Sequence, residues 1–202
     1  MSIATLPIRD NAAATPHRVY RFTVQQYHRM VETGILTGND RVELLEGCIV
    51  LKMPHNPLHD GTITRVMRRL MPLLPELWLL RVQSAITLPR SEPEPDLAIV
   101  RGSEEIYFRR HPVPRDIALL IEVADSSLLH DRRNKGAIYA GARIPQYWLI
   151  NLVETVLEVY TQPRTGRAAS YRGQRTLGID ESVPLVVDGH ELAKIPVNRL
   201  LP

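Results

Sequence analysis

Ile117-Ala-Leu-Leu-Ile-Glu-Val-Ala124 is the most strand-like segment of the chain. Continuous apolar runs of this length are typical of strands that are covered on both faces of a sheet. Glu122 interrupts the run, and a carboxylate is costly to bury unless it is paired, hydrogen-bonded or bound to a metal. Side chains alternate along a strand, so Leu120, Glu122 and Ala124 are expected to share one face. The segment therefore predicts a central strand that carries a candidate functional acid.

A second apolar run, Asp96-Leu-Ala-Ile-Val100, begins with an acid directly after Pro95. The rigid segment before it is expected to deliver Asp96 to the start of a strand. Two carboxylates on neighbouring strands can supply the hard oxygen ligands that Mg²⁺ or Mn²⁺ prefers. The alternatives are that Asp96 only caps a turn and that Glu122 pairs with an arginine such as Arg143.

A charged stripe follows on a helix predicted over residues 128–142. Asp131, Lys135 and Tyr139 are spaced by four and so share one side of that helix. Apolar neighbours indicate that this side faces the sheet, which points Lys135 toward Glu122. Its ammonium could then orient an attacking water or stabilise charge on phosphoryl oxygens. The alternative is an ordinary helix pair between Asp131 and Lys135, worth about 0.2–0.5 kcal/mol.

Two further acids and one histidine are secondary candidates. Glu43 and Glu46 lie near the turn of a strand pair predicted over residues 42–52, and each alone is more simply a solvated carboxylate. His59 lies in the first turn of a helix that begins at Asn56-Pro57. It is expected to face inward, where a single histidine is more often a structural hydrogen-bonding residue than a ligand.

The remaining elements follow from hydrophobic period and turn residues. They are a helix over residues 23–32, one or two strands over 77–88, and strands over 146–152, 155–161 and 183–187. Strands and helices mix without strict alternation, which predicts a mixed sheet with helices packed on it. Residues 1–20 are expected to form a flexible arm and residues 21–202 a single domain.

The composition is that of a globular protein. Hydrophobic residues make up 44% and charged residues 23% of the chain, and the net charge of +3 permits an anionic partner without demanding one. Cys48 is the only cysteine, which excludes an internal disulfide and a cysteine-based zinc cluster. With no apolar stretch of membrane-spanning length and no secretory signal, a cytoplasmic protein without a membrane partner is expected.

The order and spacing of several short motifs resemble the Uma2 family of the PD-(D/E)XK nuclease-like superfamily, a group of restriction-endonuclease-like proteins. The resemblance runs from about Phe22 to Tyr160. It is carried by Glu43-Leu-Leu-Glu-Gly47, His59, Pro95-Asp96, Ile121-Glu-Val123 with Ser126-Ser127, Asp131, Lys135, Tyr139 and Tyr147-Trp-Leu-Ile-Asn151.

The resemblance implies a restriction-endonuclease-like fold, in which helices flank a central mixed sheet. It also implies that Asp96 and Glu122 are the metal-binding acids and that Glu43 is an additional acid of the site. One departure matters, because the superfamily lysine should stand two positions after Glu122, where this chain has Ala124. The downstream Lys135 then looks like a migrated replacement.

The leading hypothesis is a Mg²⁺- or Mn²⁺-dependent endonuclease that acts on DNA, with Asp96, Glu122 and the Val123 carbonyl as metal ligands. Lys135 is expected to position the attacking water or to help deprotonate it. Glu46, His59, Asp131 and Tyr139 are further residues of the same predicted site. Alternatives are a non-catalytic DNA-binding or protein-interaction module with the same fold, and a nuclease for RNA or for branched or damaged DNA.

Two expectations concern how DNA would be bound. Arg65, Arg68 and Arg69 lie off the buried stripe of their predicted helix and are candidates for phosphate contacts, although a plain solvated face also explains them. A homodimer is expected, because cutting both strands of a duplex is simplest with two symmetric sites.

Overall fold

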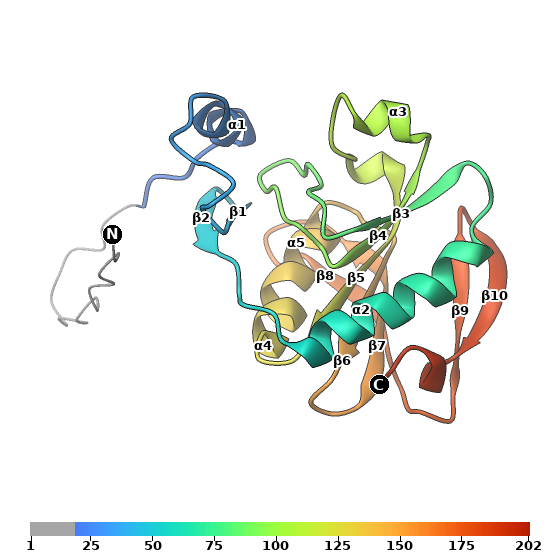
Figure 1. The fold of residues 1–202 in the computed structure, drawn as a ribbon. Helices are drawn as coiled ribbons and strands as arrows, with labels where there is room; N and C mark the ends of the chain where they lie inside the picture. The colour runs from blue at the N-terminus through green and yellow to red at the C-terminus, as the bar shows by residue number, and fades with distance from the viewer. Residues whose placement is uncertain (1–18) are drawn as a thin grey trace, which may run out of the picture.

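The computed structural model of the chain describes residues 19–202 (Figure 1). The flexible arm expected over residues 1–20 therefore lies almost wholly outside the described residues. Within the described part, a mixed sheet is flanked by helices, which confirms the predicted fold class.

A six-stranded sheet forms the centre of the fold, in the order β3-β4-β5-β6-β7-β8. The strands are β3 (Trp78–Val82), β4 (Leu97–Arg101), β5 (Ile117–Ala124), β6 (Gln146–Asn151), β7 (Val156–Arg164) and β8 (Ser170–Leu177). Only β5 and β6 run parallel, and every other neighbouring pair is antiparallel. The central strand predicted from its apolar run is β5, and it lies between β4 and β6.

The parallel pair needs a crossover connection, which a helical segment supplies. This segment comprises α4 (Leu128–His130), the π-helical turn η3 (Asp131–Lys135) and α5 (Gly136–Gly141). The helix predicted over 128–142 is therefore present, but one wide turn lies in its middle. The Asp131 carbonyl accepts hydrogen bonds from the backbone N–H of Gly136 and from the Tyr147 hydroxyl, at 3.2 Å, which together stabilise the wide turn.

Each face of the sheet has its own apolar core. On one face lie α2 (Pro57–Leu70) and the hairpin of β9 (Ser182–Val187) and β10 (His190–Pro196) (Figure 1). The α4–α5 segment covers the other face, where Leu120 and Ala124 of β5 pack with Tyr139. Alternation along β5 places Glu122 on this second face, as predicted.

The N-terminal elements are α1 (Val24–Glu32), β1 (Val42–Leu45) and β2 (Cys48–Leu51). Thr23 caps α1 through a reciprocal capping box with Gln26. The backbone N–H of Glu92 donates to the Leu44 carbonyl at 2.7 Å, which ties β1 to the loop before β4. This tie brings an acid of β1, Glu43, toward the end of the central sheet.

Some element predictions were wrong. The strand expected over residues 77–88 ends at Val82, because Gln83 has a φ of 44° and the chain leaves the sheet there. Strands β8 and β10 were not predicted, since their mixed polar sequences carry little hydrophobic period. Short helical turns complete the fold: η1 (Met71–Leu73), α3 (Glu104–Tyr107), η2 (Pro114–Asp116) and η4 (Val197–Arg199). No helix of residues 19–202 has the length and apolar character that crossing a bilayer requires.

Candidate functional site

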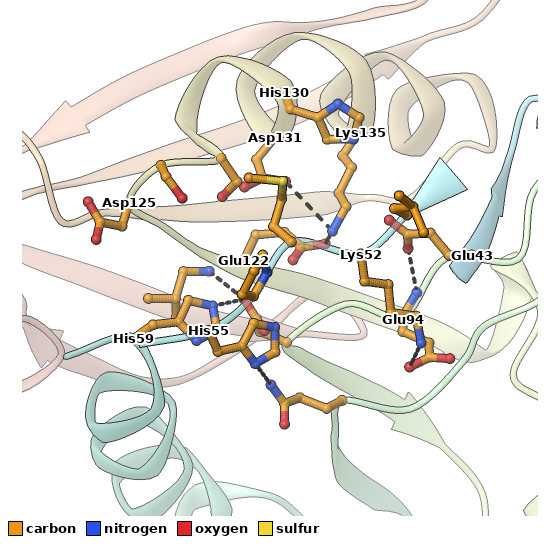
Figure 2. A pocket seen from close by; sticks show the side chains of 18 of the residues that line it. Glu43, Lys52, His55, His59, Glu94, Glu122, Asp125, His130, Asp131 and Lys135 are labelled. Atoms are coloured by element: carbon orange, nitrogen blue, oxygen red, sulfur yellow. Dashed lines mark hydrogen bonds and ion pairs between the residues drawn. The ribbon is translucent and has the colours of Figure 1, made fainter. Parts of the chain in front are cut away.

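A cleft of about 410 Å³ opens where the start of β4, the end of β5, the first turn of α2 and the α4–α5 segment meet (Figure 2). Most residues predicted for the site line it: Glu43, His59, Asp96, Glu122, Val123, Asp131 and Lys135. Residues in or beside five elements, namely β1, α2, β4, β5 and the α4–α5 segment, therefore contribute to one cleft.

Asp96 lies at the entry to β4 and is buried. Its Oδ2 accepts a hydrogen bond from the Val123 backbone N–H at 2.9 Å and lies 3.2 Å from His59 Nε2. Burial alone raises the pKa of Asp96, but the contact and charge of His59 and the bond from Val123 bring the pKa below its usual value. Asp96 is therefore an ionised carboxylate whose Oδ1 takes no hydrogen bond from residues 19–202.

Glu122 is buried on the face of β5 that packs against α4–α5. Its Oε1 accepts hydrogen bonds from Lys135 Nζ at 3.0 Å and from the Tyr139 hydroxyl at 2.6 Å. Burial raises the pKa of Glu122 to about 8, against the opposing effect of Lys135 and with the support of nearby Asp96 and Asp131. The alternative of a pair with Arg143 is wrong, because Arg143 is exposed at the surface.

The strand register places the two acids side by side. Leu97 of β4 pairs with Ile121 of β5 in an antiparallel ladder, so the next positions outward are Asp96 and Glu122. Directly opposed residues point to the same face of a sheet. The two carboxylates are therefore on one side of the sheet, as predicted.

Lys135 is buried and points toward Glu122, which confirms its predicted orientation. Its Nζ also lies 3.6 Å from Asp131 Oδ1, so the helix pair considered as an alternative exists as well, but it is buried and not solvated. Burial alone lowers the pKa of Lys135, yet Glu122, Glu43, Asp131 and Asp96 together raise it above its usual value. Lys135 is therefore a firmly protonated ammonium among four acids.

Glu43 approaches the cleft from β1 on the opposite side from His59 (Figure 2). Its Oε2 accepts a hydrogen bond from the Glu94 backbone N–H at 3.1 Å, and its side chain is buried. Glu46 does not reach this cleft, because it lies in the β1–β2 turn with a φ of 48° and faces Arg90 at 3.5 Å. Turn geometry thus separates two acids that are only three residues apart.

Asp96, Glu122 and Glu43 share one arrangement. In each, one carboxylate oxygen is held by hydrogen bonds, and the other takes none from residues 19–202. Six acids line the cleft against two lysines, Lys52 and Lys135, so acidic groups are in excess there. Carboxylate oxygens held in place are what a hard divalent cation such as Mg²⁺ or Mn²⁺ requires, so the donor set fits such an ion, whose charge would also favour ionised Glu122.

The sequence reasoning missed a second cluster beside the first. His55, His59 and Asp60 form the one group of three or more histidine, cysteine or acidic residues, among residues 19–202, whose ligand atoms all lie within 4.8 Å of one another. The spacing of four between His55 and His59 was the available signal. It was weak because His55 precedes the helix that carries His59. The same residues affect titration: burial lowers the pKa of His59, but the carboxylates of Asp96 and Asp60 raise it above its usual value.

Comparisons with known proteins agree with this architecture. The model of the Uma2 family, described as "Putative restriction endonuclease", matches residues 24–194. Among solved structures, the chain is similar to the crystal structure of a "putative nuclease belonging to DUF820" from Anabaena variabilis, with a TM-score of 0.60 and 14% sequence identity. That match covers 89% of this chain and 97% of the other, and at this identity it shows a shared fold. No curated protein matches the chain in sequence.

Proposed function

The chain belongs to the Uma2 family, and from that membership and the cleft we propose that it is a divalent-metal-dependent endonuclease that hydrolyses phosphodiester bonds of DNA. The observation that carries the proposal is the burial of Asp96, Glu122 and Lys135 at one cleft. Buried charges cost stability, and replacing them with well-packed apolar residues is often neutral or stabilising. A module that only binds a partner through this fold has no use for such a set.

The free oxygens of Asp96 and Glu122 are the proposed metal ligands, with the Val123 carbonyl completing the protein's share. Glu43 would bind the same ion through water, or a second ion. A bound Mg²⁺ or Mn²⁺ would polarise the phosphate and lower the pKa of its bound water. Ligand positions would be fixed before the ion arrives, because Val123, Glu94 and Lys135 already hold the other oxygen of each acid.

Lys135 has a positioning and electrostatic role in this proposal. Because neighbouring acids raise its pKa, it remains protonated at neutral pH and is unsuited to accept a proton from water. Its ammonium holds Glu122 in place and presents positive charge to the phosphoryl oxygens as negative charge develops on them. Tyr139 fixes the same Glu122 oxygen from the core, and Asp131 holds the ammonium from its own helical turn.

The experiment is a cleavage assay on duplex DNA, single-stranded DNA and RNA, each with Mg²⁺, with Mn²⁺ and with EDTA. We expect cleavage of DNA with either ion and none with EDTA. Glu122→Gln should remove cleavage, whereas the matched control Asp188→Asn should not, because Asp188 lies exposed in the β9–β10 turn.

The assay also separates the alternatives. DNA binding without cleavage under every metal condition would favour the non-catalytic module. Cleavage confined to RNA would keep the metal chemistry but change the substrate.

A further inference from the structure

His55, His59 and Asp60 lie together where the segment after β2 enters α2. Figure 2 shows the two histidines at the rim of the cleft. His55 Nδ1 lies 3.5 Å, and His59 Nδ1 lies 3.2 Å, from the same oxygen, Asp60 Oδ1. In a tetrahedral site with bonds of about 2.0–2.1 Å, neighbouring ligand atoms are roughly 3.3–3.4 Å apart. Each histidine nitrogen therefore lies at about the ligand-to-ligand separation of a single ion from the shared Asp60 oxygen, and all three ligand atoms lie within 4.8 Å of one another.

A carboxylate already orients one of the two rings from behind. His59 Nε2 lies 3.2 Å from Asp96 Oδ2, and the His59 ring is buried. The His55 ring is stacked on it with centroids 4.3 Å apart and planes 28° apart, so the more exposed His55 ring must rotate for the in-plane lone pairs of both rings to meet at one ion. A metal-ligating histidine almost always donates its other N–H to a carboxylate, a carbonyl or water, which fixes the ring and its tautomer. Here Asp96 is that partner, so Nδ1 of His59 is the nitrogen left for an ion.

The ligand types favour one class of ion. Two imidazole nitrogens and one carboxylate suit Zn²⁺ and similar transition metals, whereas Mg²⁺ prefers oxygen ligands and water. Asp60 is well exposed and His55 partly so, which leaves positions open to water. The positive end of α2 opposes a cation, and the Asp60 carboxylate offsets this. The Gln83 amide, 3.0 Å from His55 Nδ1, must turn aside when an ion binds.

We propose that His55, His59 and Asp60 bind a Zn²⁺-type ion that clamps the segment over residues 52–56 to α2. This segment forms one wall of the cleft. The ion would fix that wall and, through His59, the position of Asp96. The proposal stands on ligand geometry and does not require nuclease activity.

The test is equilibrium binding of Zn²⁺ to the full chain after removal of any polyhistidine tag, with Co²⁺ as a spectroscopic substitute. With excess Mg²⁺ present to occupy the carboxylate site of the cleft, we expect one tightly bound Zn²⁺ per chain and the visible absorption of tetrahedral Co²⁺. His55→Gln and Asp60→Asn should each weaken Zn²⁺ binding about tenfold or more. His130→Gln is the matched control, because His130 lines the same cleft from the α4–α5 segment and lies outside the cluster.

Folding of the variants is checked without metal by circular dichroism and melting temperature, and both substitutions are at accessible positions. The proposal is overturned if the wild-type chain binds no Zn²⁺ at micromolar concentrations. It is equally overturned if His130→Gln weakens binding as much as His55→Gln, or if Mg²⁺ competes on equal terms. Because Zn²⁺ binding is the readout, a chain that cleaves no nucleic acid still gives a decisive result.

Discussion

At the scale of single residues, the site depends on how Glu122 and Lys135 share a buried space. Lys135 is charged in a place where an unpaired ammonium would be costly. The surrounding acids Glu43, Asp96 and Asp131 compensate its charge, and Glu122 accepts its hydrogen bond at 3.0 Å. The residue two positions after Glu122 on the same strand is Ala124, whereas Lys135 reaches Glu122 from the crossover helix. The ammonium reaches the acid from the opposite layer of the fold.

The first prediction concerns Lys135. Lys135→Met removes the charge at similar length and should lower the cleavage rate about 100-fold, because an interaction worth roughly 3 kcal/mol in the transition state is lost. Lys135→Arg should not restore the parent rate, since a planar guanidinium cannot occupy the place of a compact ammonium. Rates are measured with Lys194→Met as the control at an exposed lysine. A parent-like rate for Lys135→Met would show that the lysine is only structural.

The second prediction follows from the raised pKa of Glu122, about 8 in the folded chain. Between the ordinary glutamate pKa and this value, the folded state keeps a proton that the unfolded state has lost. The free energy of unfolding contributed by Glu122 therefore falls as pH rises through this window. Glu122→Gln has no ionisable group at this position. Without metal, its free energy of unfolding should therefore rise relative to that of the wild type, by on the order of a few kcal/mol, between about pH 5 and pH 8. A difference in melting temperature between variant and wild type that stays constant across this range would contradict the raised pKa of Glu122.

Sequence reasoning worked best at this scale where an acid interrupts an apolar run. Glu122 and Asp96 stand out because burial makes a carboxylate costly, and that cost is visible without a structure. His55 and Asp60 carry no such mark, because both lie at accessible positions and only the turn into α2 brings them to His59. Glu46 belongs to the same motif as Glu43, but it lies in the β1–β2 turn with a positive φ, and its side chain does not reach the cleft that Glu43 lines.

At the scale of elements, the π-helical turn sets the directions of the charged side chains in the α4–α5 segment. Arg132 in this turn donates from Nε to Glu158 Oε2 of β7 at 3.0 Å, and Glu158 also accepts from Asn151 and Tyr160. Burial alone raises the pKa of Glu158, but these hydrogen bonds and the charge of Arg132 bring it below its usual value. The network anchors the segment to the sheet beside the cleft.

The third prediction is that Arg132→Ala destabilises the fold by about 3 kcal/mol, because Glu158 is left buried without its cation. The exposed neighbour Arg133→Ala is the control and should cost less than about 0.5 kcal/mol in urea unfolding. Since the pKa of Glu158 is depressed, its stabilisation is present above the ordinary glutamate pKa and is lost in acid. The difference in free energy of unfolding between Arg132→Ala and wild type should become smaller as pH falls through the pKa of Glu158 in the folded state. A difference that stays constant down to strong acid would refute the role of Glu158.

The fourth prediction concerns the arginines on α2. Arg65 donates to the Leu201 carbonyl at 2.5 Å and so anchors the C-terminus, whereas Arg68 and Arg69 are exposed and border a surface hollow with Arg199. Arg68→Ala with Arg69→Ala should weaken DNA binding equally for all sequences and lower the salt dependence by roughly one to two counterions. The control pair is Arg109→Ala with Arg115→Ala. An unchanged salt dependence would assign the α2 arginines to a plain solvated face.

The elements themselves were predictable in proportion to their periodicity. The helix α2 and strand β5 combine strong patterns with clear start and stop residues, so their bounds agree with the sequence. The sequence carries no signal for the π-helical turn, because the hydroxyl that stabilises it belongs to Tyr147, which lies outside the helical segment in β6. Strand β8 carries alternating polar residues at the sheet edge, where burial gives little pattern.

At the scale of the whole molecule, the fold places one acid-rich cleft at the end of a sheet, with a histidine cluster at its rim. The homodimer and the cytoplasmic location expected from the sequence stay predictions, and so does a single domain over residues 21–202. The proposed function requires that the cleft performs metal-dependent hydrolysis.

The most direct measurement is the DNA cleavage rate of Asp96→Asn beside wild type and Asp188→Asn, at saturating Mn²⁺. Asparagine preserves the shape of Asp96 and removes the charge that would hold the ion, so several kcal/mol of transition-state stabilisation are lost. We expect a rate at least about 100-fold below wild type for Asp96→Asn, together with weaker Mn²⁺ binding, while Asp188→Asn cleaves like wild type. Equal rates for Asp96→Asn and wild type would rule out Asp96 as a metal ligand and place any hydrolysis outside this cleft.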